Sequence, residues 1–345
     1  MTTTLSSRKR HYLKALGIFL ILAALMAAIV GCVGLPSEHL EIRTWHDLDA
    51  IRDNLGGSYV LINDLDATTA GYEELAGSTA NRGYGWQPIG GSPGNPFRGT
   101  LDGRGYKITG LYVNRPWEIV GLFGFVADEG EVRNVRVTNA DITGGSRAGG
   151  LVGSNYGVVT SSCSTGSVRG NDYTGGLVGA NRGTVSKSYS AGNVTTSWSG
   201  HSSFSLPLQY ATGDPLHGAT GGLIGWNEGT VADSYSRASV REKNSVGGLV
   251  GANIGQISRC YATGSLYAYE TFGLVVGAHG VASNSFWDVE TTGTDQSGGG
   301  VGRTTAEMKQ ESTFAEAGWD FENVWDINEM NEGYPFLSWQ VNNRE

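Results

Sequence analysis

The chain of 345 residues has few of the groups from which enzyme sites are assembled. Cysteine occurs only three times, as Cys32, Cys163 and Cys260, and proline only eight times. Neither an H-E-x-x-H pattern nor a P-loop is present, which removes the signatures of zincin proteases and P-loop nucleotide sites. The sequence predicts no catalytic residue, no metal site and no cofactor, and it leans against an enzyme.

Positive charge is also scarce, because 24 Lys and Arg residues face 33 Asp and Glu residues, a formal net charge of −9. Residues 1–31 hold four basic residues and no acidic one, so the rest of the chain is more acidic still. Such a body lacks the basic surface that phosphate contacts need. We therefore expect no nucleic-acid partner.

Long apolar runs are confined to the N-terminus. Basic residues in "SSRKRHYLK" precede the sixteen uncharged residues "ALGIFLILAALMAAIV", and "IVGC" ends at Cys32. This end resembles a bacterial lipobox, which implies lipidation of Cys32 and removal of residues 1–31. Because residues 17–35 are all uncharged, an uncleaved membrane anchor is an alternative, as is simple secretion. All three predict an extracytoplasmic protein, the first two with a membrane anchor.

Glycine, by contrast, is abundant, with 54 residues, and much of it lies in a repeat. "GGLVGANRGTVSKSYSAGNV" begins at Gly175, and close copies begin at Gly149, Gly221 and Gly247, with weaker copies at Val120 and Gly273. The copies resemble the GLUG repeat, a Gly-rich motif of bacterial and archaeal surface proteins and of some immunoglobulin A peptidases. The metalloprotease motif of those peptidases is absent, so the resemblance implies no protease activity.

The repeat predicts the fold. Most copies start 26 residues apart, and each holds short apolar runs separated by Gly, Asn and Ser. Runs this short form strands, and no single copy can bury its own apolar side. We therefore predict an all-β, right-handed parallel β-helix with one coil per copy, a rise of about 4.8 Å per coil and short helical caps.

An asparagine recurs at the seventh position of the motif, where stacked coils place it in one column. A side-chain amide can both donate and accept hydrogen bonds, so a buried column of amides can satisfy itself. We interpret the column as structural; its members are Asn155, Asn181, Asn227 and Asn253. His279 takes this place in the last copy, where we expect a fraying coil rather than a metal ligand.

Aromatic residues recur at the fifteenth position, as Tyr189, Tyr235, Tyr261 and Phe286. In the first copy Val135 and Val137 flank this position, and strand alternation then turns it outward. The stripe is either a platform for sugar rings or a partner, or aromatic packing between coils that a loop covers. If the position faces inward instead, the stripe is only core.

A 20-residue insertion separates two of the copies, between Val194 and Gly221. We expect it to leave the solenoid as one loop beside the tyrosine stripe. Long loops on rigid scaffolds often carry function, which makes Trp198 and Tyr210 candidates for ligand binding. The spacing of His201 and His217 matches no zinc pattern, so we predict no metal there.

The non-repeating ends are predicted to be caps. Trp45, Leu48, Ile51 and Leu55 are spaced as on a helix that stops at Gly56. The predicted organisation is an export signal (1–31), a linker and N-terminal helical cap (32–57), first coils (58–119), repeat coils (120–290) with the 195–220 insertion, and a C-terminal cap (291–345).

Three functions fit this organisation. The favoured one is a surface-anchored, non-enzymatic β-helix for adhesion, glycan binding or envelope structure, which is by default a monomer because its ends are capped. The second is a polysaccharide lyase or glycoside hydrolase, by analogy with other parallel β-helices. Acidic residues such as Asp288, Glu290 and Asp295 show no spacing that pairs them for this. The third is a purely structural spacer.

Overall fold

A computed structural model describes residues 39–196, 218–242, 245–275 and 280–341. Cys32, Trp198 and Tyr210 lie outside these residues, as do all residues of the predicted export signal and His201, His217 and His279. None of the helices in the described part is long and apolar enough to cross a membrane.

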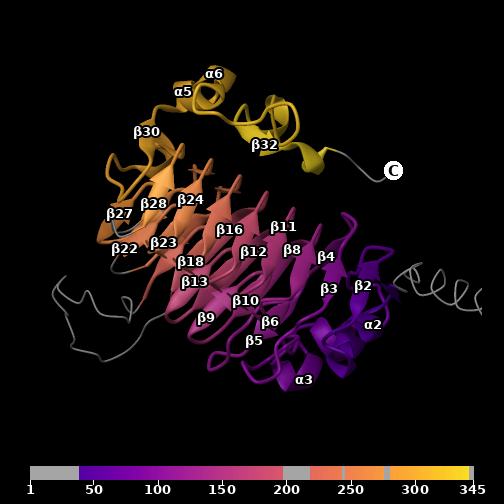
Figure 1. The fold of residues 1–345 in the computed structure, drawn as a ribbon. Helices are drawn as coiled ribbons and strands as arrows, with labels where there is room; N and C mark the ends of the chain where they lie inside the picture. Colours follow the sequence, from indigo (N-terminus) through magenta and orange to yellow (C-terminus); the bar gives the residue numbers. More distant parts are fainter. Residues whose placement is uncertain (1–38, 197–217, 243–244, 276–279, 342–345) are drawn as a thin grey trace, which may run out of the picture. The chain divides into compact units, whose positions relative to one another are not determined.

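Consecutive coils stack as a parallel β-helix, as the repeat predicts (Figure 1). A coil runs through four short strands that belong to four different sheets, which we name D, C, A and B in chain order. The coil that begins at Arg147 shows this with β9 (Arg147–Gly149), β10 (Val152–Asn155), β11 (Val158–Thr160) and β12 (Cys163–Gly170). Every strand pair within the four sheets is parallel, because each strand lies on its counterpart in the next coil.

Sheets A and C form two of the walls. Sheet A has nine strands, namely β1 (Leu40–Ile42), β2 (Ser58–Leu61), β3 (Thr100–Asp102), β7 (Glu131–Arg133), β11, β15 (Thr184–Ser186), β19 (Thr230–Ala232), β24 (Gln256–Ser258) and β28 (Val281–Ser283). Sheet C has five, namely β6 (Phe123–Val126), β10, β14 (Val178–Asn181), β18 (Ile224–Asn227) and β23 (Val250–Asn253).

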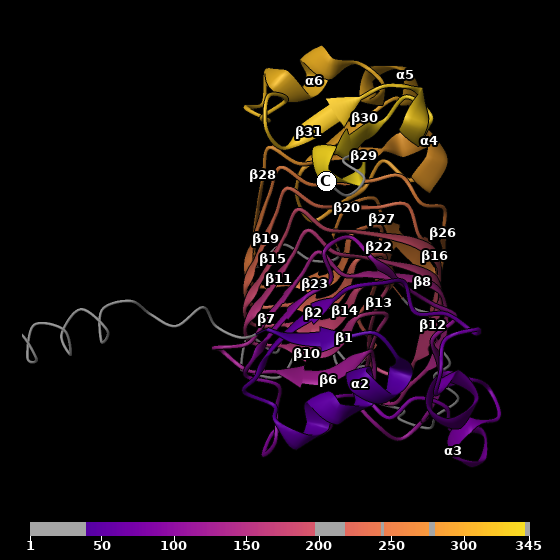
Figure 2. The same ribbon diagram turned by 90° about the vertical axis from the view of Figure 1, so that its right-hand side faces the viewer.

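Sheets B and D complete each coil; in Figure 2 β7, β11, β15, β19 and β28 of sheet A lie on the left, and β8, β12, β16 and β26 of sheet B lie on the right. Sheet B comprises β4 (Lys107–Thr109), β5 (Tyr112–Asn114), β8 (Arg136–Thr143), β12, β16 (Tyr189–Thr196), β20 (Tyr235–Ser236), β21 (Ser239–Arg241), β25 (Tyr261–Ala262), β26 (Leu266–Tyr267), β29 (Phe286–Asp288) and β30 (Val301–Arg303). Sheet D comprises β9, β13 (Tyr173–Gly175), β17 (Thr220–Gly221), β22 (Ser245–Gly247) and β27 (Glu270–Phe272).

The register between coils follows the sequence spacing. Val152 pairs with Val178, which is 26 residues further on, and Val178 pairs with Ile224, which is 46 residues further on. Val250 pairs with Val275, one residue short of the period. The register therefore continues unchanged across the 20-residue insertion, and the last copy closes its coil with one residue fewer.

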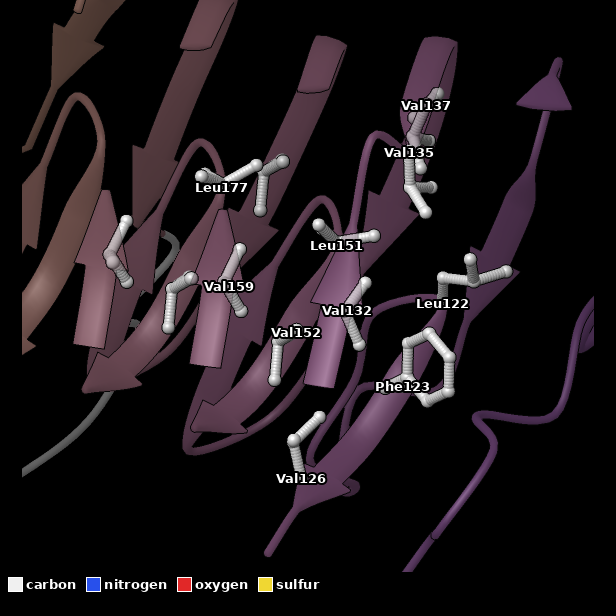
Figure 3. Packing of buried hydrophobic residues seen from close by; sticks show 14 of the residues in the cluster. Leu122, Phe123, Val126, Val132, Val135, Val137, Leu151, Val152, Val159 and Leu177 are labelled. Carbon is white, nitrogen blue, oxygen red and sulfur yellow. The ribbon is translucent and has the colours of Figure 1, made fainter. Parts of the chain in front are cut away.

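The core is a column of aliphatic side chains that point inward from sheets A, B and C. Figure 3 shows this packing, with Val132 and Val159 from sheet A, Leu122 and Leu151 from the turns into sheet C, and Val135 before β8. A second, smaller cluster lies between sheet D and the far half of sheet B, and consists of Val194, Ala238, Val240, Val246 and Leu266. We call the part of the solenoid around it the side lobe.

Short helices and turns cover the N-terminal end. Trp45, Leu48 and Ile51 are fully buried there, and Thr44 and Asp47 form a capping box at the helix start, as a helical cap requires. Sheet A begins with β1, so the first strand lies inside the segment predicted as linker and cap. These elements are α2 (Trp45–Asp49), a 3₁₀ turn (Ala50–Asp53), a π-helical turn (Tyr72–Ala76) and α3 (Ala80–Gly83).

The C-terminal part has two roles rather than the single predicted one. Residues 294–303 continue the last coil, since the amide of Gly273 donates to the carbonyl of Gln296 and β30 pairs with β29. Residues 304–341 then turn back along the outside of sheet B, where they are yellow in Figure 1. The elements are α4 (Val289–Thr292), α5 (Thr305–Met308), α6 (Glu311–Ala315), 3₁₀ turns (Glu329–Asn331 and Ser338–Gln340), and the antiparallel pair β31 (Trp325–Ile327) and β32 (Pro335–Leu337).

The stacking predicts which glycines tolerate a side chain. A Cβ on Gly183 would lie 2.0 Å from the carbonyl oxygen of Gly157 in the preceding coil. We expect Gly183→Ala to lower the free energy of unfolding by about 1–3 kcal/mol, because the backbone of one of the two coils must move to make room for the Cβ. Gly94→Ala is the control, since nothing lies within 4 Å of its Cβ position. Urea midpoints of the full chain measure both, and equal midpoints would contradict the close contact between these two coils.

Candidate functional site

The asparagine column is a continuous hydrogen-bonded ladder. Nδ2 of Asn155 donates to Oδ1 of Asn181 at 2.8 Å, Asn181 donates to Asn227 at 2.7 Å, and Asn227 donates to Asn253 at 2.7 Å. Only Oδ1 of Asn155 lacks a partner, because the preceding coil has Val126 at this place. Every other amide group of the ladder serves the fold, so the column offers nothing to a ligand.

A second polar ladder, of serines, lies at the corner between sheets A and B. Oγ of Ser162 accepts the amide of Val135 at 3.1 Å, and Oγ of Ser188 accepts the amide of Ser162 at 3.2 Å. Ser234 and Ser285 repeat the arrangement, and Cys260 stands where the column is interrupted. This position was not singled out from the sequence. The recurrent serine itself was the signal that could have revealed the ladder.

The tyrosine stripe faces outward from the coil. Val135 and Val137 belong to the main core, whereas Tyr235 and Tyr261 belong to a separate cluster with residues of the C-terminal segment. The rings of Tyr189, Tyr235 and Tyr261 stack in parallel, with centroids 5.0 and 4.8 Å apart and interplanar angles of 5° and 2°. The orientation expected from strand alternation is therefore found.

The stripe is nevertheless not an open binding platform. Tyr235 is 1% exposed and Tyr261 is fully buried, while Tyr189 is partly buried. Residues 304–341, which we call the C-terminal strap, cover the stripe with an apolar layer that buries these rings. The strap residues in this cluster are Met308, Phe314, Ala317, Trp319, Phe321, Val324, Trp325, Tyr334, Leu337 and Trp339.

Polar contacts fix the strap onto the stripe. The hydroxyl of Tyr261 donates to the carbonyl of Pro335 at 2.6 Å and accepts Nδ2 of Asn331 at 2.9 Å. Trp339 donates to the carbonyl of Lys187 at 2.8 Å. Burial raises the pKa of Tyr235 and Tyr261 well above the usual value, so both hydroxyls stay protonated. The proposed ligand-binding role of the tyrosines is therefore replaced by a packing role.

The insertion does not leave beside the stripe. Tyr189 begins β16, whereas the insertion follows Thr196 at the other end of the same strand. Seven residues of strand place the two points up to about 23 Å apart. The insertion follows a strand of sheet B and precedes a strand of sheet D. The corners between these two sheets recur in successive coils and form a line along the solenoid, which we call the B–D edge.

The two described cysteines are buried and free. Burial raises the pKa of the Cys163 thiol to about 11 and that of Cys260 to about 12, so both are protonated at neutral pH and poor nucleophiles. Cys163 occupies the stripe position and Cys260 the serine column, in agreement with structural roles.

Two of the three acidic residues considered for catalysis hold the fold together, whereas Asp295 is exposed. Asp288 is fully buried, and its Oδ2 accepts the hydroxyls of Thr305 at 2.8 Å and Tyr334 at 2.7 Å. Glu290 accepts the amide of Thr305. Among the described residues, no three His, Cys, Asp or Glu side chains are grouped so that they could hold a metal ion.

One match to a catalytic pattern was overlooked in the sequence. Residues 90–94, "GGSPG", fit G-x-S-x-G, in which the serine of an α/β-hydrolase stands between a strand and a helix. Here Ser92 is exposed in a tight turn and pairs with Asn95 across it. The match lacks the strand–turn–helix context, so it is a turn sequence.

The B–D edge carries aromatic residues that stand in solvent. Trp117 is 89% exposed in the corner that leads into the first repeat copy, and Tyr269 is 90% exposed in the corner that leads into the last one. Tyr267 is half exposed beside it, and its ring lies 5.0 Å from the guanidinium of Arg241. Sequence reasoning missed these residues because they lie in corners that do not repeat. With the roots of the insertion, they make this edge the candidate binding surface.

Comparison with known sequences identifies the repeat. The model of the GLUG motif matches residues 244–267, which include β22 to β26 of the fifth coil. The chain carries GLUG repeats. The other coils hold the same motif in the same register, so the stacked amides and close glycine contacts described above are what this motif builds here.

Two relatives share part of the chain. A protein named as a Gly-rich membrane protein in Evansella cellulosilytica is 36% identical over 139 residues, and halomucin of Haloquadratum walsbyi is 34% identical over 141 residues. Each match covers 39% of this chain, but only 15% of the first relative and 2% of halomucin. The chain thus spans a small fraction of the length of these relatives.

A solved structure shares the whole architecture. A chain named as an immunoglobulin A1 protease from Bacteroides ovatus superposes with a TM-score of 0.64 at 19% identity, over 89% of this chain and 94% of that one. At this identity the likeness concerns the fold alone, and it agrees with the parallel β-helix predicted from the repeat.

The strap contacts predict the effect of a conservative change. Tyr261→Phe removes a buried hydroxyl with two partners, so we expect the free energy of unfolding to fall by about 1–3 kcal/mol. Tyr267→Phe is the control, because Tyr267 is half exposed. Urea unfolding of the full chain measures both. A Tyr261→Phe variant as stable as the control would show that the strap does not seal the stripe.

Proposed function

We propose that this protein is a cell-surface, non-enzymatic β-helix that binds a glycan or another envelope polymer along its B–D edge. The names of the two relatives, a membrane protein and halomucin, support a surface location. The lipobox-like sequence ending at Cys32 supports an anchor, by lipid or by an uncleaved N-terminal segment. The acidic body supports binding to a neutral or basic ligand rather than to nucleic acid.

The observation that carries the proposal is the contrast between two sets of aromatic residues. The rings that the repeat aligns on sheet B are sealed by the strap, whereas Trp117, Tyr267 and Tyr269 stand exposed at the B–D edge. Exposed Trp and Tyr side chains supply large, rigid contact area for a ligand. Both ends of the edge carry such rings, so an extended polymer fits it better than a compact molecule does.

The bonds of the acidic residues favour binding over catalysis. Asp233 forms a bidentate ion pair with Arg259, with both distances 2.7 Å. Glu228 forms a bidentate ion pair with Arg182 at 2.9 and 2.8 Å. Asp288 accepts the hydroxyl of Tyr334 from the strap. The oxygens of these carboxylates are therefore engaged in bonds that hold the fold together. A glycosidase needs instead two carboxyl groups directed at one bond of the substrate.

Capped ends favour a monomer on the cell surface. The first strand of sheet A, β1, carries Glu41, which forms an ion pair with Arg43 directly after the strand, and charged edges resist pairing with a second copy. A monomer presents the whole length of the B–D edge to its ligand.

Binding assays on glycan arrays and on isolated envelope polysaccharide test the proposal with the full chain. Trp117→Ala and the double variant Tyr267→Ala/Tyr269→Ala should each weaken binding about tenfold, since truncating an interface aromatic commonly removes more than about 1 kcal/mol. Ile254→Ala, an exposed apolar residue at another corner, should bind normally. If no polymer binds, or if both variants bind like wild type, the proposed function is wrong.

A further inference from the structure

The two roots of the insertion meet inside the side lobe. Thr196 ends β16 and Thr220 begins β17, and their hydroxyl oxygens lie 2.5 Å apart. In the preceding coil Thr174 pairs with Thr220 in sheet D, is fully buried, and has a hydroxyl without a hydrogen-bond partner. A short column of hydroxyl groups thus interrupts the apolar interior at this point.

Glu242 lies over this column in the next coil. It follows β21, where the register pairs Thr195 with Arg241, and its amide donates to the carbonyl of Tyr267. Glu242 is 8% exposed, and with the described residues neither carboxyl oxygen forms a hydrogen bond of normal geometry, although the hydroxyl of Thr220 is near enough to favour the charged form. The carboxyl group lies against the second root of the insertion, because a Cβ on Gly218 would be 2.9 Å from its Oε1.

The described surroundings of Glu242 do not compensate a negative charge. The neighbouring side chains are the hydroxyls of Thr196 and Thr220 and the apolar cluster of the side lobe. Among the described residues no charged side chain is near enough to shift its titration, and Arg241 is exposed, with its guanidinium over the ring of Tyr267. A buried carboxylate without partners is unfavourable, whereas the neutral acid is tolerated.

We propose that Glu242 is a pH-sensitive latch at the base of the insertion. When protonated, its neutral carboxyl group stays packed against Gly218 and Thr220 and keeps the side lobe closed. When ionised, it is stable only in contact with water, so β17, β21 and β22 open locally. The latch would make the insertion-bearing coil of the B–D edge respond to the pH outside the cell.

The direction follows from linkage. Burial raises the pKa of Glu242 from 4.5 to about 7, against a smaller lowering by the hydroxyl of Thr220. The closed form therefore binds the proton more tightly than the open form does. Its contribution to stability is complete below about pH 4.5 and is lost as the pH rises through about 7.

Hydrogen exchange of the full chain at pH 5.5 and 8.5, corrected for intrinsic rates, tests the latch. In the wild type the opening equilibrium of residues 239–247 should rise on the order of 30-fold between the two values. In Glu242→Gln, which keeps a neutral side chain of the same shape, it should not change. Glu129→Gln, an exposed carboxyl in an earlier coil, should behave like wild type.

Difference infrared spectroscopy provides a measurement that needs no folded variant. The wild type should show the band of a buried, protonated carboxylic acid at pH 5.5 that disappears by pH 8.5. The absence of that band, or equal protection of residues 239–247 at both pH values, would overturn the proposal. Binding to a polymer is not part of this test, so its result is independent of the proposed function.

Discussion

The structure depends on one constraint, which is that each coil must lie directly on the next with backbone in contact. Glycines at the corners allow this approach, because a Cβ on Gly183 would meet the carbonyl of Gly157 at 2.0 Å. Buried corners then need partners for their polar groups, and identical residues in successive coils supply them. The asparagine ladder and the serine ladder both follow from this constraint.

The same stacking decides which surface is left for function. Aromatic residues aligned on sheet B would form an exposed apolar stripe, and the chain covers it with its own C-terminal strap. The strap reaches from the coil of Phe286 back to that of Arg136, whose guanidinium bonds to the carbonyl of Trp339. It thereby ties successive coils together. The B–D edge, where Trp117 and Tyr269 stand, is left open.

The repeated part of the fold could be predicted from the sequence, because its information is local and periodic. The column of Asn181 and the outward direction of Tyr235 follow from spacing and strand alternation alone. The cover over Tyr235 could not be predicted, because it depends on contacts between distant parts of the chain. Tyr189 and Trp339, for example, are 150 residues apart, and Trp339 lies in a segment without repeats. The burial of Glu242 could not be predicted for a related reason, since it requires sheet D to close the side lobe.

The fold requires that coils stack in register across the 20-residue insertion. A double-mutant cycle between Asn181 and Asn227, 46 residues apart, tests it most directly, with urea unfolding of the two Asn→Ala single variants and the double variant. The structure predicts a coupling energy of about 0.5–3 kcal/mol, because each single change leaves the other amide without its partner in the ladder. Additive changes, with coupling near zero, would contradict the account and would mean that the insertion separates two independent stacks.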